Sequence, residues 1–207
     1  MKYYILIFLR KLFLIRRNPF YIFSNLSELY KFLRITWIEG NSQDSVGQTD
    51  YLKKVALDKS NILEIGFNAG HSAETFLSSN NHSKVTSIDE ASHDYIDYGY
   101  YYLSRKFKKR LRLHKIDSAK IASEIDTKET FDLIFIDGFH SYEYAKNDML
   151  NCKNFSDDGT LMILDDFDDQ ELSRAWGELI KSGVIEQVEI VRYSDNSSKA
   201  MGVARYL

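Results

Sequence analysis

The sequence predicts a doubly wound α/β fold, in which helices cover both faces of a mostly parallel sheet. The first observation is the stretch from Asn61 to Ser72, where a short apolar run ends in a glycine loop that leads into a helical pattern. The second is the alternation of strand and helix patterns that follows. The third is that five successive strand patterns end in or next to an acidic residue.

The predicted elements follow one another at short intervals. We expect parallel strands at 62–65, 85–89, 111–116, 131–137 and 159–164, and a closing antiparallel hairpin of strands 184–193 and 199–206. Helices are expected at 24–35 and 50–57, from 72 onward, and at 91–107, 119–125, 142–155 and 169–182. Thr49 is expected to cap the second of these helices. The sheet would therefore contain seven strands.

Length and composition fit one domain with a short extension. The chain has 207 residues, and we predict an N-terminal helical extension at 1–45 followed by the main domain at 46–207. The net charge of −3 gives no general signal for nucleic-acid binding. The single cysteine, Cys152, excludes an internal disulfide framework and fits a reducing compartment, so we expect a cytoplasmic protein.

Residues 1–23 are aromatic, apolar and basic, with no acid before Glu28. Arg10 and Lys11 interrupt the apolar run, which argues against a transmembrane helix because each central cation would cost about 3 kcal/mol. Two interpretations stay open. The segment packs on the domain or on a second copy of the chain, or it lies on a membrane surface as an interfacial helix.

The glycine loop indicates a bound ligand, because a strand end, a tight loop and a helix N-terminus bring backbone N–H groups to one point. Dinucleotide-binding loops have a middle glycine that admits a pyrophosphate, whereas Asn68 stands at that position here. Glu64, near the strand end, favours a cationic or hydroxyl-rich ligand. An ordinary strand-to-helix turn is the alternative.

The pattern Glu64-x-Gly66-x-x-x-Gly70-x-Ser72 resembles motif I of the class I S-adenosylmethionine-dependent methyltransferases. The resemblance implies a Rossmann-like methyltransferase sheet and S-adenosylmethionine as the cofactor. It also implies a set of cofactor-binding residues, namely Glu64, Gly66, Asn68, Gly70, Ser72, Asp89, Asp117 and Ser118. Asp89 would bind the ribose, with Glu90 as the alternative if the register slips by one. Asp117 and Ser118 would meet the adenine, with a helix cap as the alternative.

Phe131 to Asp148 and Leu161 to Asp166 resemble the small-molecule O-methyltransferases of the catechol and macrocin type, and the resemblance extends over about Val46 to Tyr206. It implies a divalent cation, Mg²⁺ or similar, held by Asp137, Asp165 and Asp166. His140 falls where catechol-type enzymes place a lysine base, and a histidine bonded to a loop backbone is the alternative. Residues 46–48 resemble a loop that covers the cofactor, or they form an ordinary linker.

These inferences together predict a methyltransferase that methylates a hydroxyl on a small molecule or sugar with the help of a metal ion. His140 and Asp137 would be its catalytic residues, and we expect no nucleic-acid partner. Peripheral membrane contact through residues 1–23 and a homo-oligomer are further expectations. One rival function is a non-catalytic Rossmann-like binding or scaffold module. The other, which the missing middle glycine disfavours, is an NAD-dependent oxidoreductase.

Overall fold

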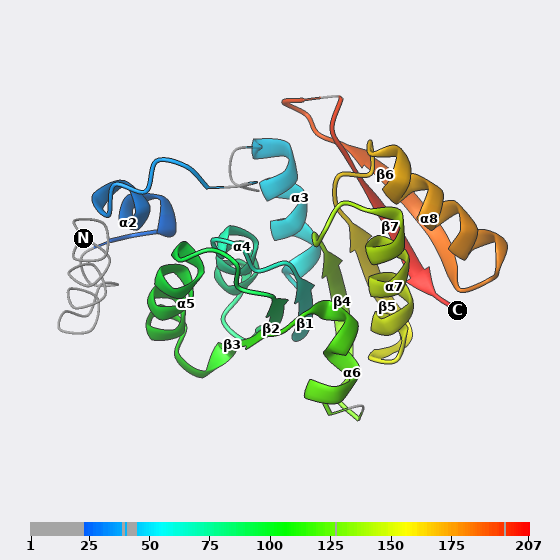
Figure 1. Cartoon of the computed structure of the whole chain (residues 1–207), viewed down its shortest axis with the longest axis horizontal. Coiled ribbons are helices and arrows are strands. Elements are labelled where there is room, and N and C mark those ends of the chain that lie inside the picture. The colour runs from blue at the N-terminus through cyan, green and yellow to red at the C-terminus, as the bar shows by residue number, and fades with distance from the viewer. Residues whose placement is uncertain (1–22, 39, 41–44, 127, 197) are drawn as a thin grey trace.

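The computed structural model describes residues 23–38, 40, 45–126, 128–196 and 198–207, which form a seven-stranded sheet flanked by helices (Figure 1). The strands are β1 (Asn61–Ile65), β2 (Lys84–Asp89), β3 (Leu111–Lys115), β4 (Phe131–Ile136), β5 (Ser156–Leu164), β6 (Ile185–Arg192) and β7 (Ala200–Tyr206). The α-helices are α2 (Leu26–Phe32), α3 (Val46–Ala56), α4 (His71–Ser79), α5 (Tyr95–Lys106), α6 (Ile121–Glu124), α7 (Tyr142–Lys153) and α8 (Gln170–Lys181). Two 3₁₀ turns, η3 (Lys108–Arg110) and η4 (Ser118–Lys120), flank β3.

The strand order is β3-β2-β1-β4-β5-β7-β6. Strands β1 to β5 pair in parallel, and β7 pairs antiparallel with both β5 and β6. The order reverses between β1 and β4, which is where doubly wound sheets bind their ligands. The predicted fold class, including its antiparallel C-terminal hairpin, is confirmed.

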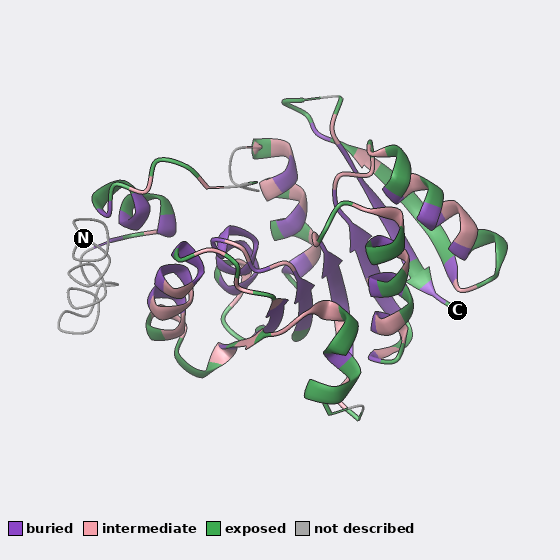
Figure 2. Cartoon of the chain, viewed as in Figure 1, coloured by how far each residue is buried: buried purple, intermediate pink, exposed green. Residues whose placement is uncertain are grey.

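The sheet separates two hydrophobic cores, and its central strands are buried while β6 and the outer faces of the helices are largely exposed (Figure 2). The alternation of side chains along β1 sends Ile62 into one core and Leu63 and Ile65 into the other. The first core includes residues of α2 to α5, and the second includes residues of α6 to α8. Burial on both faces explains why the strands read as near-continuous apolar runs.

Two helices begin about four residues away from their predicted starts, whereas the other starts differ by one or two residues at most. Helix α3 starts at Val46 because the Ser45 side chain caps it by accepting from Gln48 N, so residues 46–48 form a helical turn and not a loop or linker. Thr49 therefore lies inside the helix, and its predicted role as a cap is wrong. Helix α5 starts at Tyr95 and not near Ala91, because Ala91 has a φ of 59°, outside the right-handed helical region.

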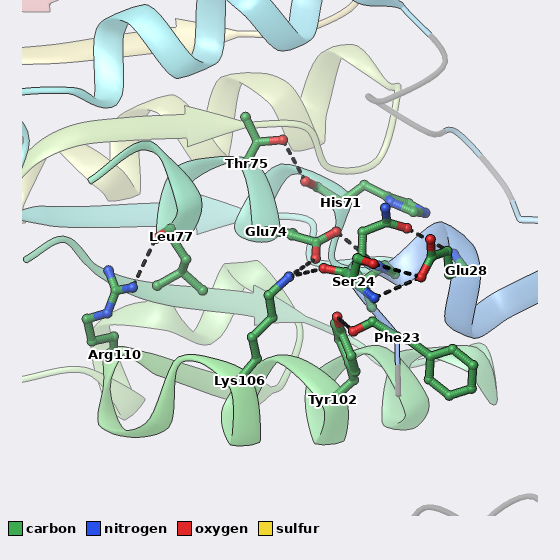
Figure 3. A network of polar contacts seen from close by, with 12 residues as sticks. Phe23, Ser24, Glu28, His71, Glu74, Thr75, Leu77, Tyr102, Lys106 and Arg110 are labelled. Carbon is green, nitrogen blue, oxygen red and sulfur yellow. Dashed lines mark hydrogen bonds and ion pairs between the residues drawn. The ribbon is translucent and has the colours of Figure 1, made fainter. Parts of the chain in front are cut away.

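Helix α2 is joined to the domain through the buried carboxylate of Glu74 on α4 (Figure 3). One oxygen of Glu74 accepts from Leu26 N at 3.1 Å, and the other accepts from Lys106 Nζ at 2.9 Å. Lys106 also donates to Ser24 O at 2.6 Å, and Tyr102 OH donates to Phe23 O at 2.9 Å. Glu74 thus links α2, α4 and α5, which enclose the glycine loop on one side.

The N-terminal segment that we predicted to pack or to lie on a membrane falls outside the described residues, apart from Phe23. No helix within the described ranges has the length and apolar character that a membrane span requires. Membrane contact, a homo-oligomer and the division of the chain at residue 45 stay predictions.

The Glu74 contacts give the first testable prediction. Glu74→Ala should lower the free energy of unfolding by about 2 kcal/mol, because it leaves a buried N–H group and a partly buried ammonium without their acceptor. Chemical denaturation measures the change. Glu171→Ala is the matched control, since Glu171 makes an exposed ion pair with Arg174 and its loss should cost less than about 0.5 kcal/mol. Equal losses in the two variants would contradict the assignment.

Candidate functional site

A cavity of about 570 Å³ opens beyond the carboxyl ends of β1, β2 and β4. Its volume lies within the range of about 300–1,000 Å³ that is typical of small-molecule sites. Of the predicted site residues, eight line it, and these are Gly66, Asn68, Asp89, Asp117, Ser118, Asp137, His140 and Asp166. The cavity therefore brings together the predicted cofactor and acid residues that lie far apart in the sequence.

The glycine loop depends on close contact between β1 and β4. Gly66 has a φ of +94°, and a Cβ atom at this residue would lie 1.9 Å from the carbonyl oxygen of Asp137. The two segments are joined by Asp137 N, which donates to Ile65 O at 2.9 Å. Gly70 ends the loop in the left-handed region, at φ +85°, and its own Cβ would lie 2.8 Å from the Phe67 ring. Both positions require glycine.

Glu64 lies behind the loop and does not line the cavity. Its carboxyl group is fully buried and accepts from Ser72 Oγ and Ser87 Oγ, each at 2.5 Å. Burial raises the pKa of Glu64 to about 8, so the group is mostly uncharged at neutral pH. Glu64 and Ser72 therefore hold the start of α4 against β1 and β2 and make no contact with the cavity.

Asp89 ends β2 in the predicted register and stands at the cavity wall. One of its oxygens accepts from Asn68 N at 2.7 Å, and the other accepts from Ala91 N at 2.7 Å. Asn68 reaches this position with a φ of 47°. Each carboxylate oxygen keeps a second lone pair, so Asp89 can still accept hydroxyl groups from a ligand. Glu90, the alternative residue, lines the same cavity.

Asp117 and Ser118 form the wall next to Asp89. Asp117 caps the η4 turn by accepting from Ala119 N at 3.0 Å, which is the alternative role weighed for it, and both residues also line the cavity. The Ser118 side chain bonds to Asp148, a buried acid on α7. Burial raises the pKa of Asp148 to about 6. The sequence analysis did not single out Asp148, because one acid within a helix pattern carries no signal.

Asp137, His140 and Asp166 meet at the other end of the cavity, and one possible ligand atom from each lies within 4.8 Å of the others. His140 Nε2 is 3.2 Å from Asp166 Oδ2 and 3.9 Å from Asp137 Oδ1. Asp137, and then the charge of Asp166, raise the pKa of His140 to about 9. His140 is therefore a cation at neutral pH in this arrangement.

Asp165 is the third predicted metal ligand, and it is placed differently from Asp137 and Asp166. Gln48 Nε2 donates to one of its oxygens and Tyr193 OH donates to the other, and Asp165 does not line the large cavity. Burial raises the pKa of Asp165 well above its usual range. Asp165 thus joins the start of α3 to the end of β6. Its role as a metal ligand stays a prediction, as do the other predicted residue roles.

Several residues that the sequence analysis did not include contribute to the site. Phe139 and Tyr144 line the cavity beside His140, and the centroids of their rings lie 5.3 Å apart. Phe139 is 69% exposed, which is unusual for an aromatic side chain and could not be read from the sequence. Tyr193 and Lys199 reach Asp165 and Asp166 from the β6–β7 turn. Such contacts between distant segments leave no pattern in a single sequence.

Residues 63–167, about half of the chain, match the sequence family described as a methyltransferase domain. The chain belongs to this methyltransferase family. The matched residues include the end of β1, the glycine loop and every acid that lines the cavity. A search of curated proteins returned no match to the methyltransferase.

Solved structures share the fold of the methyltransferase at low sequence identity. The O-methyltransferase of Bacillus cereus in complex with SAH is 17% identical, with a TM-score of 0.68, and the match covers 86% of this chain and 88% of that one. An SAH-bound methyltransferase of Podospora anserina is 14% identical, with a TM-score of 0.70 and coverages of 88% and 87%. A Staphylococcus aureus protein provisionally described as a caffeoyl-CoA O-methyltransferase is 18% identical, with a TM-score of 0.70 and coverages of 95% and 99%.

The close approach at Gly66 gives a second prediction. Gly66→Ala should lower the free energy of unfolding by about 3 kcal/mol, because the new methyl group meets the Asp137 carbonyl and the left-handed φ becomes strained. Gly177→Ala is the matched control. Gly177 lies within α8 with open space around it, so alanine there should stabilise the protein by about 0.5–1 kcal/mol. Denaturant titration of both variants tests the prediction, which a neutral Gly66→Ala would contradict.

The buried carboxyl of Glu64 gives a third prediction. Its pKa is about 8 in the folded protein, and the reference value of 4.5 stands for the unfolded chain. Between these pH values the folded state therefore binds more protons than the unfolded state. Stability should therefore fall as the pH rises through this window. Glu64→Gln removes this dependence. Between pH 5 and pH 9 the wild type should lose about 3–5 kcal/mol more than the variant, measured by urea unfolding. Parallel pH profiles would show that Glu64 is charged in the fold.

Proposed function

We propose that the methyltransferase transfers a methyl group from S-adenosylmethionine to a hydroxyl of a small molecule or sugar, with the assistance of a divalent cation. One observation carries the proposal. A single cavity has Asp89 and the glycine loop at one end, and the Asp137–His140–Asp166 cluster at the other. Such a cavity can bind a cofactor and present an acceptor hydroxyl to it.

The cofactor end fits a nucleoside ligand. Asp89 has lone pairs for ribose hydroxyls, and Gly66 and Asn68 line the same part of the cavity. Ser118 and Asp117 would bound the adenine. When bound, S-adenosylmethionine supplies a methyl group on a positively charged sulfur. The SAH in the structures from B. cereus and P. anserina supports this choice of cofactor.

The acceptor end fits a cation. Asp137 and Asp166 offer carboxylate oxygens, the ligands that Mg²⁺ and Mn²⁺ prefer. We propose Asp137 and Asp166 as the first ligands, with Asp165 held behind them by Gln48 and Tyr193. A bound divalent cation would lower the pKa of an acceptor hydroxyl.

His140 is the group that would take the proton from the acceptor. It can do so only in its neutral form, and its raised pKa of about 9 disfavours that form at neutral pH. Added positive charge in the cluster would weaken the hold of Asp137 and Asp166 on the imidazolium proton. The proposed base therefore works best when the cluster holds a further cation.

Oxygen is the favoured acceptor atom for two reasons. A divalent cation held by the acid cluster would favour a hydroxyl that is losing its proton, and the neighbouring solved structures include O-methyltransferases. The exposed rings of Phe139 and Tyr144 stand beside His140 and would pack against the acceptor. The alternatives of a scaffold module and an NAD-dependent enzyme have no comparable support.

The fourth prediction tests the two ends of the cavity separately. Calorimetric titration of SAH into the wild type should give a micromolar Kd. Asp89→Ala should weaken SAH binding at least tenfold, because the ribose loses its acceptor. Asp137→Asn should abolish methyl transfer to a panel of diols while the Kd for SAH stays within a few-fold.

Asp58→Ala is the control, since Asp58 is exposed and precedes the N-terminal end of β1, whereas the cavity lies at the C-terminal ends of the strands. It should leave both binding and transfer unchanged. Failure of the wild type to bind SAH would overturn the proposal and favour a scaffold module. Loss of SAH binding in Asp137→Asn equal to that in Asp89→Ala would contradict the separate roles of the two ends.

A further inference from the structure

The acid cluster already contains a cation that belongs to the chain. Lys199 lies in the β6–β7 turn, immediately before β7. Its Nζ is 2.8 Å from Asp166 Oδ1 and 3.3 Å from Asp168 Oδ2. His140 approaches the other oxygen of Asp166 at 3.2 Å. Both oxygens of Asp166 are therefore engaged by positively charged groups.

The backbone around Lys199 is fixed against the loop that carries Asp166. Phe167 N donates to Ala200 O at 2.8 Å, and Tyr193 N donates to Lys199 O at 3.1 Å. The backbone of Ala200 is thus bonded to the β5–α8 loop, and the backbone of Lys199 is bonded across the turn to Tyr193. The held backbone places the Lys199 side chain beside Asp166 and Asp168, where its ammonium pairs with both carboxylates while the side chain stays 44% exposed.

Asp166 also depends on these contacts. Its φ of 45° places a non-glycine residue in the left-handed region, which costs free energy and needs support from neighbours. The ion pairs with Lys199 and His140 supply that support and fix the direction of the carboxylate. The same carboxylate is one of the ligands that we propose for the divalent cation.

We propose that Lys199 is the resident cation of this cluster and that a divalent cation reaches Asp166 only in competition with it. The inference rests on the acid cluster of the proposed function. An ammonium within hydrogen-bonding distance of a ligand oxygen repels a divalent cation at that oxygen. Lys199 therefore sets how tightly the cluster binds Mg²⁺ or Mn²⁺.

The test is titration of Mn²⁺ alone into the whole protein, followed by electron paramagnetic resonance of the free ion. Lys199→Met removes the ammonium and keeps an unbranched side chain, so it should bind Mn²⁺ at least tenfold more tightly than the wild type. Lys199→Arg retains the charge and should bind as weakly as the wild type. Circular dichroism confirms that each variant is folded.

Lys181→Met is the matched control for net charge. Lys181 is exposed at the end of α8, about 16 Å along the helix from the Asp166 loop. It should leave the Mn²⁺ affinity within about twofold of the wild type. Unchanged or weaker Mn²⁺ binding by Lys199→Met would overturn the proposal, and so would the absence of binding in every variant. Because SAH is not present, these outcomes are distinct from failure of the cofactor assignment.

Discussion

The site depends on the contact between the end of β1 and the end of β4. Gly66 can pass directly beside the Asp137 carbonyl because it has no side chain. This contact sets the glycine loop and Asp137 next to each other at the point where the strand order reverses. The buried carboxyl of Glu64 then fixes the loop from behind through Ser72 and Ser87. The glycine loop and the acid cluster consequently share one wall of the cavity.

The β6–β7 turn holds the opposite side of the site. Tyr193 bonds to Asp165 and Lys199 pairs with Asp166, while Asp195 accepts from Ser45 Oγ and from the first two backbone amides of α3. A Cβ at Gly47 would lie 2.5 Å from Ser194 N, so the turn also packs closely on α3. The acid cluster is thus enclosed by segments that lie about 150 residues apart in the sequence.

Sequence reasoning reached the fold because its signals are local. Apolar runs, the glycine loop and the acids at strand ends each lie within a few residues, and β1 to β5 with the closing hairpin follow from them. The prediction of a loop or linker at residues 46–48 was wrong because side chains that do not belong to the helical pattern stabilise this helix start. Asp195 accepts from Val46 N, and Ser45 accepts from Gln48 N. The partners of Asp165 and Asp166 were missed for the same reason, since Tyr193 and Lys199 become neighbours only after the sheet has formed.

The position of β7 has a consequence for the order of folding. In the chain β7 follows β6, yet in the sheet it lies between β5 and β6. Strand β6 is attached to the sheet only through β7, so it joins together with β7 or after it. During synthesis the parallel strands can assemble first and form the part of the cavity around the glycine loop and Asp89, while the turn that encloses the acid cluster arrives with the last hairpin. The nascent chain would therefore form the glycine-loop end of the cavity before its acid cluster is enclosed.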